Sequence, residues 1–334
     1  MIISRTPFRI SLFGGGTDYP AWYRQHGGAV LGTTINKYCY ISLRALPPFF
    51  EHRHRFVYSR VECVNSLDEV QHPAIRAVLK EAGIDVGLEI HHDGDLPARS
   101  GLGSSSSFTV GLLCALRAFH GQMSSPHYLA TEAIRIEQDV VAENVGSQDQ
   151  VWAAYGGTNL IEFRQDGAIT VSPIIMQPQR RQQLQSHMML FFTGFSRIAS
   201  EIAAKQIANM DKRRQQLRAM RGMVDEALEI LQNGNRSIAE IGTLLHDGWM
   251  LKKELADNVS TGRIDEIYEA ALAAGALGGK LLGAGGGGFM MLFVPPEAQQ
   301  AVRERLAKLV EVSFAIGSMG SRVVVYEPSG FDHT

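Results

Sequence analysis

Residues 97–107, with the sequence Pro-Ala-Arg-Ser-Gly-Leu-Gly-Ser-Ser-Ser-Ser, constrain the fold of this chain more than any other segment. They end a polar loop and lead directly into a helical apolar pattern that includes Phe108, Leu112 and Leu116. Glycines let backbone amides approach an anion, and the first turn of a helix adds unpaired N–H groups and the positive end of its dipole. Consecutive serines can complete the shell around a phosphate or bind a hard cation such as Mg²⁺. The segment therefore predicts a polyphosphate-binding loop, although a serine-rich surface loop that caps a helix has the same composition.

Two other classes of nucleotide site do not fit the chain. The stretch from Gly275 to Lys280, followed by Leu281, lacks both the spacing and the hydroxyl of a P-loop. Residues 283–288, Gly-Ala-Gly-Gly-Gly-Gly, satisfy the G-x-G-x-x-G expression, but they precede an expected strand. A dinucleotide fingerprint needs the opposite order, strand and then helix, so a dehydrogenase is not predicted.

A third glycine cluster lies near the N-terminus. Residues 7–19, Pro-Phe-Arg-Ile-Ser-Leu-Phe-Gly-Gly-Gly-Thr-Asp-Tyr, put Arg9 and Asp18 on either side of a flexible turn. Such a turn suits a polar ligand such as a sugar, with Asp18 accepting hydrogen bonds from hydroxyl groups. A plain hairpin loop in which Asp18 stabilises the turn explains the same residues.

The composition of the chain limits the kinds of partner and ligand that we expect. The formal charge of −2 shows no excess of Lys and Arg, so a nucleic-acid partner is not expected. The three cysteines form no C-x-x-C pair, and His52, His54, His91 and His92 lack a third ligand at a recognisable spacing, so neither a disulfide framework nor a zinc site is predicted. The first residues resemble a strand rather than a signal peptide, and no apolar run is long enough to span a bilayer. We expect a cytoplasmic protein with small-molecule ligands and no membrane partner. The sequence leaves open whether it forms a homodimer.

The order of patterns predicts an α+β fold rather than a doubly wound sheet, because strands and helices do not alternate regularly. The proline- and glutamine-rich stretch 173–185 predicts a boundary between an N-terminal domain, 1–175, and a C-terminal domain, 176–334. The expected strands are 2–3, 8–13, 38–44, 56–60, 88–91, 158–163, 168–172, 188–192, 289–294 and 323–326. The expected helices are 73–83, 126–143, 198–220, 222–232, 237–257, 264–275 and 297–310, besides the one that follows the serine loop.

The order of these motifs resembles the GHMP small-molecule kinases, which include galactokinase, homoserine kinase and mevalonate kinase. The N-terminal turn, the P-x-x-x-G-L-G-S-S-S loop, a helix with Glu137, the sequence Gly-Ser-Gln-Asp-Gln at 146–150, and residues 283–288 follow one another over nearly the whole chain. The resemblance implies a two-lobed fold with the active site between an N-terminal nucleotide-binding lobe and a C-terminal lobe. It also implies phosphoryl transfer from ATP, with Mg²⁺, to a hydroxyl of a small molecule.

The resemblance further implies a role for each matching residue. Asp149 would be the catalytic base or the group that orients the attacking oxygen, with Arg9 beside it. Glu137 and a loop serine, Ser105 or a neighbour, would hold Mg²⁺. The nucleotide would be bound by Pro97, Gly101, Leu102, Gly103, Ser104, Ser105 and Ser106. The acceptor would be bound by Gly15, Gly16, Thr17, Asp18, Gly286 and Gly287.

The residues alone leave alternatives open for several of these roles. Glu137 could be an exposed carboxylate on its helix, and Asp149 a turn residue at a helix end. Residues 285–288 could line the site, allow close packing of helix on strand, or do both.

One departure from the galactokinase signature bears on the acceptor. Where galactokinases carry a Glu-His pair, this chain has Gly15 and Gly16. Loss of those side chains opens room and removes a negative charge beside the far end of the sugar, which suits a longer or phosphorylated tail.

The signature with these glycines is similar to that of the D-glycero-D-manno-heptose 7-phosphate kinases, which phosphorylate the anomeric hydroxyl to give the 1,7-bisphosphate on the way to nucleotide-activated heptose. The alternatives are another hexose kinase, of the L-fucose or galactose type, and a non-catalytic sensor that binds ATP and sugar. Candidates for binding a distal phosphate are Arg24, Lys37, Arg44, Arg53 and Arg55.

Overall fold

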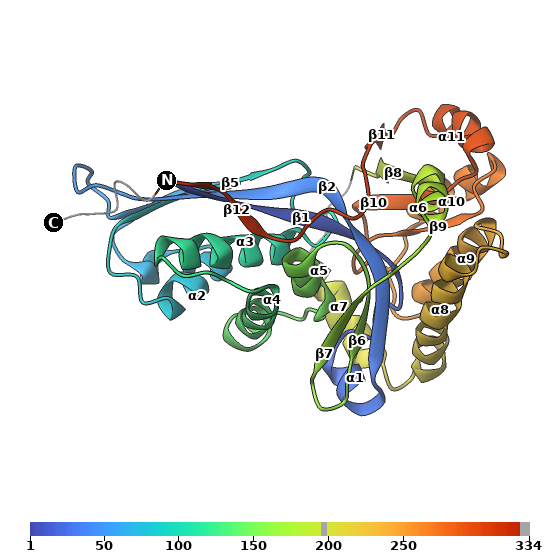
Figure 1. Ribbon diagram of the computed structural model, residues 1–334, viewed down its shortest axis with the longest axis horizontal. Helices are drawn as coiled ribbons and strands as arrows, with labels where there is room; N and C mark the ends of the chain where they lie inside the picture. The colour runs from blue at the N-terminus through green and yellow to red at the C-terminus, as the bar shows by residue number, and fades with distance from the viewer. Residues whose placement is uncertain (195–198, 328–334) are drawn as a thin grey trace.

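Two β-sheets form the frame of the computed structural model, which describes residues 1–194 and 199–327 (Figure 1). The strands of the larger sheet are β1 (Ile2–Phe13), β2 (Gly28–Ala45), β3 (His54–Val57), β4 (Val61–Val64), β5 (Leu88–Gly94), β6 (Thr158–Phe163), β7 (Ile169–Pro173) and β12 (Arg322–Tyr326). Those of the smaller sheet are β8 (Met188–Phe192), β9 (Gly278–Leu281), β10 (Phe289–Phe293) and β11 (Val310–Glu311). The larger sheet has the order β12-β1-β2-β5-β3-β4, with β6 beside β2 and β7 beside β6, and the smaller has the order β11-β8-β10-β9.

Helices cover both sheets and complete a two-lobed α+β fold (Figure 1). They are α1 (Pro20–His26), α2 (Pro73–Glu81), α3 (Ser104–Phe119), α4 (Pro126–Arg135), α5 (Gln148–Tyr155), α6 (Pro178–His187), α7 (Ala199–Asn209), α8 (Arg214–Gln232), α9 (Ala239–Lys253), α10 (Gly262–Ala273) and α11 (Gln299–Arg305). Helices α2 to α5 lie on one face of the larger sheet, and α6, α10 and α11 surround the smaller sheet (Figure 1). The α+β class is confirmed. No helix in the described ranges is long and apolar enough to cross a bilayer.

The two sheets share a hydrophobic core. Its largest cluster joins Ile10 and Leu31 of the larger sheet to Met291 and Phe293 of the smaller, all with 2% exposure or less. Strand β12, near the end of the chain, pairs antiparallel with β1 and closes one edge of the larger sheet. The larger sheet therefore includes a strand from beyond the expected boundary at 175 and 176, and that boundary stays a prediction.

Strands β1 and β2 are longer than the sequence predicts, and their pairing contains two irregularities. The register shifts between Pro7 and Arg9 and again between Ser11 and Phe13. The sequence predicts two separate strands, 2–3 and 8–13, whereas β1 continues through Pro7, with a bulge beside this residue without an N–H group. Bulges of this kind re-aim side chains, and these two flank the segment that leads to the N-terminal turn.

Several other expectations differ from the structure for local reasons. The segment expected to separate the halves contains a regular helix, α6, which begins at a proline suited to a first helical position. The break between α7 and α8 lies at 210–213 rather than at 221. The first of these helices is expected to begin at Ile198, which lies outside the described residues. The expected helix 126–143 ends as α4 at Arg135 and continues as a single π turn, Ile136–Val140. The short elements α1, β4, α5 and β9 have no sequence pattern long enough to predict them.

Candidate active site

The phosphate loop and the start of α3 lie against the N-terminal strand. Gly103 caps α3 with φ of 75°, a left-handed conformation that favours glycine. A Cβ atom there would lie 3.2 Å from Cγ of Arg9 and 3.5 Å from Cγ of Asp149. The backbone N–H of Arg9 donates to the carbonyl of Leu102 at 3.1 Å. Gly103 therefore lets the mouth of α3 approach Arg9 and Asp149 closely.

A glycine-rich segment of the other lobe, 283–288, packs against this loop. A Cβ atom on Gly101 would lie 2.3 Å from the carbonyl oxygen of Leu282, and the N–H of Phe289 donates to the carbonyl of Ser100 at 3.1 Å. Gly286 and Gly287 are buried, and the N–H of Gly286 donates to the carbonyl of Val259 at 3.0 Å. The close packing of this segment is thus observed, whereas contact of Gly286 and Gly287 with an acceptor stays a prediction.

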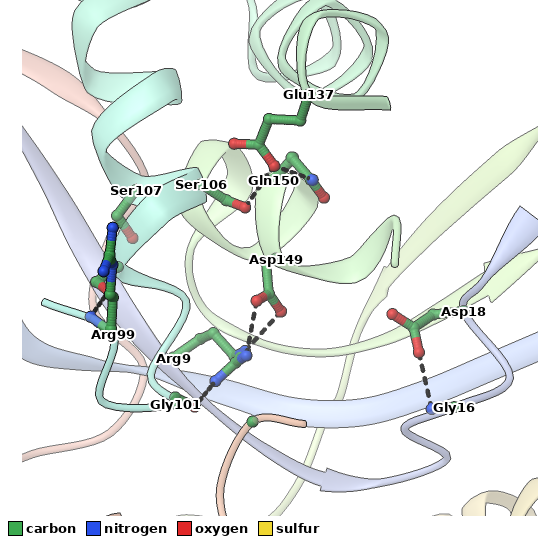
Figure 2. Close-up of polar contacts among 12 residues, drawn as sticks. Arg9, Gly16, Asp18, Arg99, Gly101, Ser106, Ser107, Glu137, Asp149 and Gln150 are labelled. Carbon is green, nitrogen blue, oxygen red and sulfur yellow. Dashed lines mark hydrogen bonds and ion pairs between the residues drawn. The ribbon is translucent and has the colours of Figure 1, made fainter. Parts of the chain in front are cut away.

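The four consecutive serines have four different environments. Ser104 Oγ accepts from the N–H of Arg99 at 3.0 Å, and Ser107 Oγ donates to the carbonyl of Pro7 at 3.0 Å. Ser106 Oγ donates to Glu137 Oε2 at 2.9 Å (Figure 2). Ser105 is exposed in the first turn of α3, and Pro97 is exposed at the start of the loop. Of the four hydroxyls, that of Ser106 therefore contacts Glu137, and which serine, Ser105 or its neighbour Ser106, holds a metal stays a prediction.

Glu137 is buried, so the alternative of an exposed helix carboxylate is wrong. It lies in the π turn that follows α4 and is 2% exposed. Gln150 Nε2 donates to Glu137 Oε2 at 2.5 Å, and Glu137 Oε1 has no partner within the described residues. Burial raises the pKa of Glu137 to about 7, while the hydrogen bonds from Ser106 and Gln150 oppose part of that rise. A buried carboxylate oxygen without a partner, beside a serine hydroxyl, fits the oxygen ligands of Mg²⁺.

Arg9 and Asp149 form a bidentate ion pair (Figure 2). Arg9 Nε donates to Asp149 Oδ1 at 2.8 Å and Nη2 donates to Oδ2 at 2.7 Å, while Nη1 donates to the carbonyl of Gly101 at 2.6 Å. Asp149 lies in the first turn of α5, not in a turn at a helix end. Its side chain is 27% exposed, whereas that of Arg9 is 5% exposed. The carboxylate is therefore held rigidly but remains open to a ligand.

Asp18 lies in the same region, to the right of Asp149 in Figure 2. Its Oδ1 accepts from the N–H of Gly16 at 2.9 Å, and a Cβ atom on Gly146 would lie 1.9 Å from its Oδ2. Burial, followed by the nearby charge of Asp149, raises the pKa of Asp18. Thr17 Oγ1 donates to the carbonyl of Gly14 at 2.8 Å. The Thr17 hydroxyl therefore stabilises the turn, and contact of Thr17 or Asp18 with a phosphoryl acceptor stays a prediction.

Two polar residues beside this turn lie within the sequence motifs but are given no role by them. Ser11 and Gln148 are 7% and 8% exposed, and neither Ser11 Oγ nor Gln148 Oε1 has a partner in the part of the chain that the structure covers. A Cβ atom on Gly15 would lie 3.7 Å from both Ser11 Oγ and Gln148 Nε2. The signals that could have indicated them are a serine within the apolar run of β1 and a glutamine next to Asp149.

Three of the five basic candidates for binding a distal phosphate have partners elsewhere. Arg44 and Arg55 form ion pairs with Glu89, a buried residue of β5, and Arg53 donates to the carbonyl of Asp85. Arg24 is exposed near the end of α1, and Lys37 is half-buried in β2. Two cations of the other lobe, Lys252 and Lys280, interact electrostatically with Arg9 and Asp18 of the site.

Comparisons with known proteins agree with this arrangement. Residues 69–157 match the GHMP kinases N terminal domain, and residues 223–312 match the GHMP kinases C terminal domain. The chain is 29% identical over 319 residues to a D-glycero-alpha-D-manno-heptose 7-phosphate kinase of Campylobacter jejuni, with 92% of this chain and 93% of that protein covered. It is 26% identical to the L-fucokinase/L-fucose-1-P guanylyltransferase of Bacteroides fragilis, over 91% of this chain and 36% of that protein.

Solved structures show the same fold. A D-glycero-D-manno-heptose 1-phosphate kinase from Bacteroides thetaiotaomicron superposes with a TM-score of 0.79, covering 98% of this chain and 100% of that chain at 24% identity. The two domain matches together span more than half of the sequence. The first of them contains the phosphate loop, Glu137 and Asp149. The chain therefore belongs to the GHMP kinases, a family of ATP-dependent phosphotransferases, and it is similar to their sugar kinases.

Proposed function

We propose that this enzyme transfers the γ-phosphate of ATP to the anomeric C1 hydroxyl of D-glycero-D-manno-heptose 7-phosphate, giving the 1,7-bisphosphate for nucleotide-activated heptose and surface polysaccharide synthesis. The choice of acceptor is supported by similarity to the Campylobacter jejuni kinase and by the absence of side chains at Gly15 and Gly16. The single observation that carries the reaction is the Arg9–Asp149 pair, because Arg9 also donates to the carbonyl of Gly101 in the phosphate loop. One side chain thus ties the acceptor-facing carboxylate to the phosphate-binding backbone.

In this proposal the residues align donor and acceptor and neutralise charge, which is most of what phosphoryl transfer requires. Backbone amides from Gly101 to Ser106 bind the nucleotide phosphates at the mouth of α3. Asp149 accepts the proton of the attacking hydroxyl or orients it, and Asp18 accepts from a second hydroxyl. Arg9 keeps Asp149 in place and offsets charge during transfer.

Glu137 and Ser106 would hold Mg²⁺. When bound, the ion neutralises the negative charge that develops on the phosphates. The protein contributes the carboxyl group of Glu137. Burial favours the protonated form of this group, so metal binding would release a proton from it.

Substitution of Asp149 by Asn tests the mechanism. We expect kcat to fall about 10²- to 10⁴-fold, because the amide cannot accept the proton, while binding of a non-hydrolysable ATP analogue stays near the wild-type value. Asn retains one hydrogen bond to Arg9, and calorimetric titration with the analogue serves as the control for an intact loop. Unchanged kcat would remove Asp149 from the mechanism, and it would favour a different base.

A panel of acceptors with ATP and Mg²⁺ tests the substrate. We expect turnover with the heptose 7-phosphate, with the new phosphate at C1 identified by phosphorus NMR. Similarity to the Bacteroides fragilis L-fucokinase supports a second candidate, a kinase for L-fucose or a related hexose. Turnover confined to such unphosphorylated sugars would favour that candidate, and absence of turnover with retained binding of ATP would favour the sensor.

A further inference from the structure

Two lysines of the C-terminal half are buried beside the active site. Lys252 in α9 and Lys280 in β9 are each 7% exposed. Both interact electrostatically with Arg9 and Asp18, and Lys252 also with Lys280. Lysine is rarely buried to this extent without a carboxylate partner, because an uncompensated ammonium group is strongly destabilised outside water. These residues therefore require an explanation beyond packing.

The amines are held by carbonyl groups, not by carboxylates. Lys280 Nζ donates to the carbonyl of Leu12 at 2.9 Å, at the irregularity between Ser11 and Phe13. Lys252 Nζ donates to the carbonyls of Leu281 and Gly283, at 2.9 and 2.5 Å. An ammonium group has three N–H donors. Within the residues covered by the structure, Lys280 thus keeps two donors without an acceptor and Lys252 keeps one.

Burial lowers the pKa of both amines, that of Lys252 well below its usual value, so each needs an anion nearby to hold its charge. Arg9 is matched by Asp149 through the bidentate pair. Among the described residues, Asp18 is then the one carboxylate that acts on both lysines, and burial raises its pKa. Burial, with repulsion by Arg9 added to it, lowers the pKa of Lys280 to about 7. An incoming dianion would balance the two lysines far better than Asp18 alone does in an environment without water.

We propose that Lys280, with Lys252 behind it, is the binding site for a phosphate group carried by the acceptor. The proposal rests on the proposed function, which gives the acceptor a phosphate at its far end. Leu12, which Lys280 contacts, lies between Arg9 and the glycine turn, and Leu255, just beyond Lys252, would touch a Cβ atom on Gly16 at 3.5 Å. The two lysines thus approach the glycine turn from the C-terminal half, through Leu12 and the leucines beside Gly16.

Inorganic sulfate is a suitable probe, because its charge does not change between about pH 6 and pH 9, so any pH dependence belongs to the protein. We expect Lys280→Met to weaken sulfate binding about 10- to 100-fold in calorimetric titration of the full chain. The matched control is Lys253→Met, since Lys253 is the residue next to Lys252 and its Nζ lies 3.3 Å from Asp265, an ion pair outside the site. Equal affinity in wild type and Lys280→Met would overturn the proposal.

The wild-type protein provides a test that does not depend on the folding of any variant. Because the anion favours the charged amine, sulfate binding should take up a proton above about pH 7 and weaken about tenfold per further pH unit. Titrations in buffers of different ionisation enthalpy measure that proton. Affinity that does not change with pH would also contradict the proposal.

Kinetics then separate this site from the proposed function. We expect Lys280→Met to raise KM for the heptose 7-phosphate and to leave KM for ATP unchanged. A change confined to KM for ATP would assign the lysine to the nucleotide and overturn the proposal. Turnover of the heptose 7-phosphate with equal KM in both proteins would keep the function and refute the site. Sulfate binding through Lys280 without turnover of that sugar would keep the anion site and refute the function.

Discussion

At the scale of single residues, Arg9 connects the carboxylate of Asp149 to the backbone of the phosphate loop. Two of its nitrogens hold the carboxylate of Asp149 and a third donates to the carbonyl of Gly101. A lysine could not replace it, because only a planar guanidinium can donate in a fixed fork to a carboxylate and still reach a third acceptor. The distance between the carboxylate and the phosphate loop is therefore set by one side chain.

Neighbouring serines allow a direct test of the metal site. We expect Ser106→Ala to raise the Mg²⁺ concentration needed for half-maximal activity by about tenfold or more, because Ser106 lies beside Glu137. Ser105→Ala is the matched control, with a smaller effect on Mg²⁺, because Ser105 is exposed and the hydroxyl that donates to Glu137 is that of Ser106. A titration of kcat against Mg²⁺ at saturating ATP measures both. The reverse order of effects would return the metal-binding role to Ser105.

The sequence could predict the chemistry of this site but not every residue that performs it. Arg9, Glu137 and Asp149 lie at motif positions, and the structure brings Arg9 and Asp149 into contact. The choice between Ser105 and Ser106 depends on where α3 begins, because successive residues of a helix point about 100° apart. Buried polar atoms such as Gln148 Oε1 become visible only when the chain around them is folded.

At the scale of secondary structure, the π turn after α4 places Glu137 in the interior. Single π turns within α-helices are rare and occur frequently at functional sites. An amphipathic pattern with a period of 3.6 residues continues through Ile136–Val140 without revealing the extra residue in the turn. The sequence could therefore predict a helix through this region, but not the burial of its carboxylate.

Burial of Glu137 makes the free energy of unfolding of the metal-free protein depend on pH, and the sign of that dependence follows from the pKa shift. Its pKa is 4.5 in the unfolded chain and about 7 in the folded protein, so the folded state holds more protons between these values. The free energy of unfolding should therefore fall as pH rises from 4.5 to about 7, by up to about 3 kcal/mol from this residue. Urea unfolding at several pH values with a metal chelator measures the slope. Glu137→Gln should flatten it, and an identical slope in that variant would contradict the assignment.

The contact between the phosphate loop and the 283–288 segment can be tested with two glycines of similar conformation. Gly101 and Gly167 have φ of 85° and 90°, but an added Cβ atom would lie 2.3 Å from the carbonyl oxygen of Leu282 at Gly101 and would meet nothing within 4 Å at Gly167. We expect Gly167→Ala to lower the free energy of unfolding by about 1–2 kcal/mol from backbone strain alone. Gly101→Ala should lower it by roughly 2 kcal/mol more, with loss of ATP binding. Equal losses in the two variants, measured by urea unfolding, would show that the contact adds nothing.

At the scale of the whole molecule, the lobes are joined by packing and by the chain itself. One hydrophobic cluster includes residues of both sheets, and β12 returns from the C-terminal part of the chain to pair with β1. The sequence predicts the lobes because strand and helix patterns change near residue 175, but local patterns carry no information about which distant strands pair. The partner of β1 could therefore not be predicted from the residues of β12.

The shared core predicts a single cooperative unfolding transition for the full chain in calorimetry. A fragment of residues 1–175 lacks β12 and the part of the core supplied by β10, including Met291 and Phe293. We expect this fragment to lack stable tertiary structure, which near-UV circular dichroism and hydrogen exchange would measure. Two separate transitions, or a stably folded fragment, would instead support independent domains.

The return of β12 has a consequence for synthesis on the ribosome. The hydrogen-bonding edge of β1 that later pairs with residues 322–326 must wait until those residues have been translated. At about 5–20 residues per second, the wait is roughly 15 to 60 seconds. During that time residues 2–5 of β1 present open amide and carbonyl groups to other nascent chains, and a strand made much later protects them.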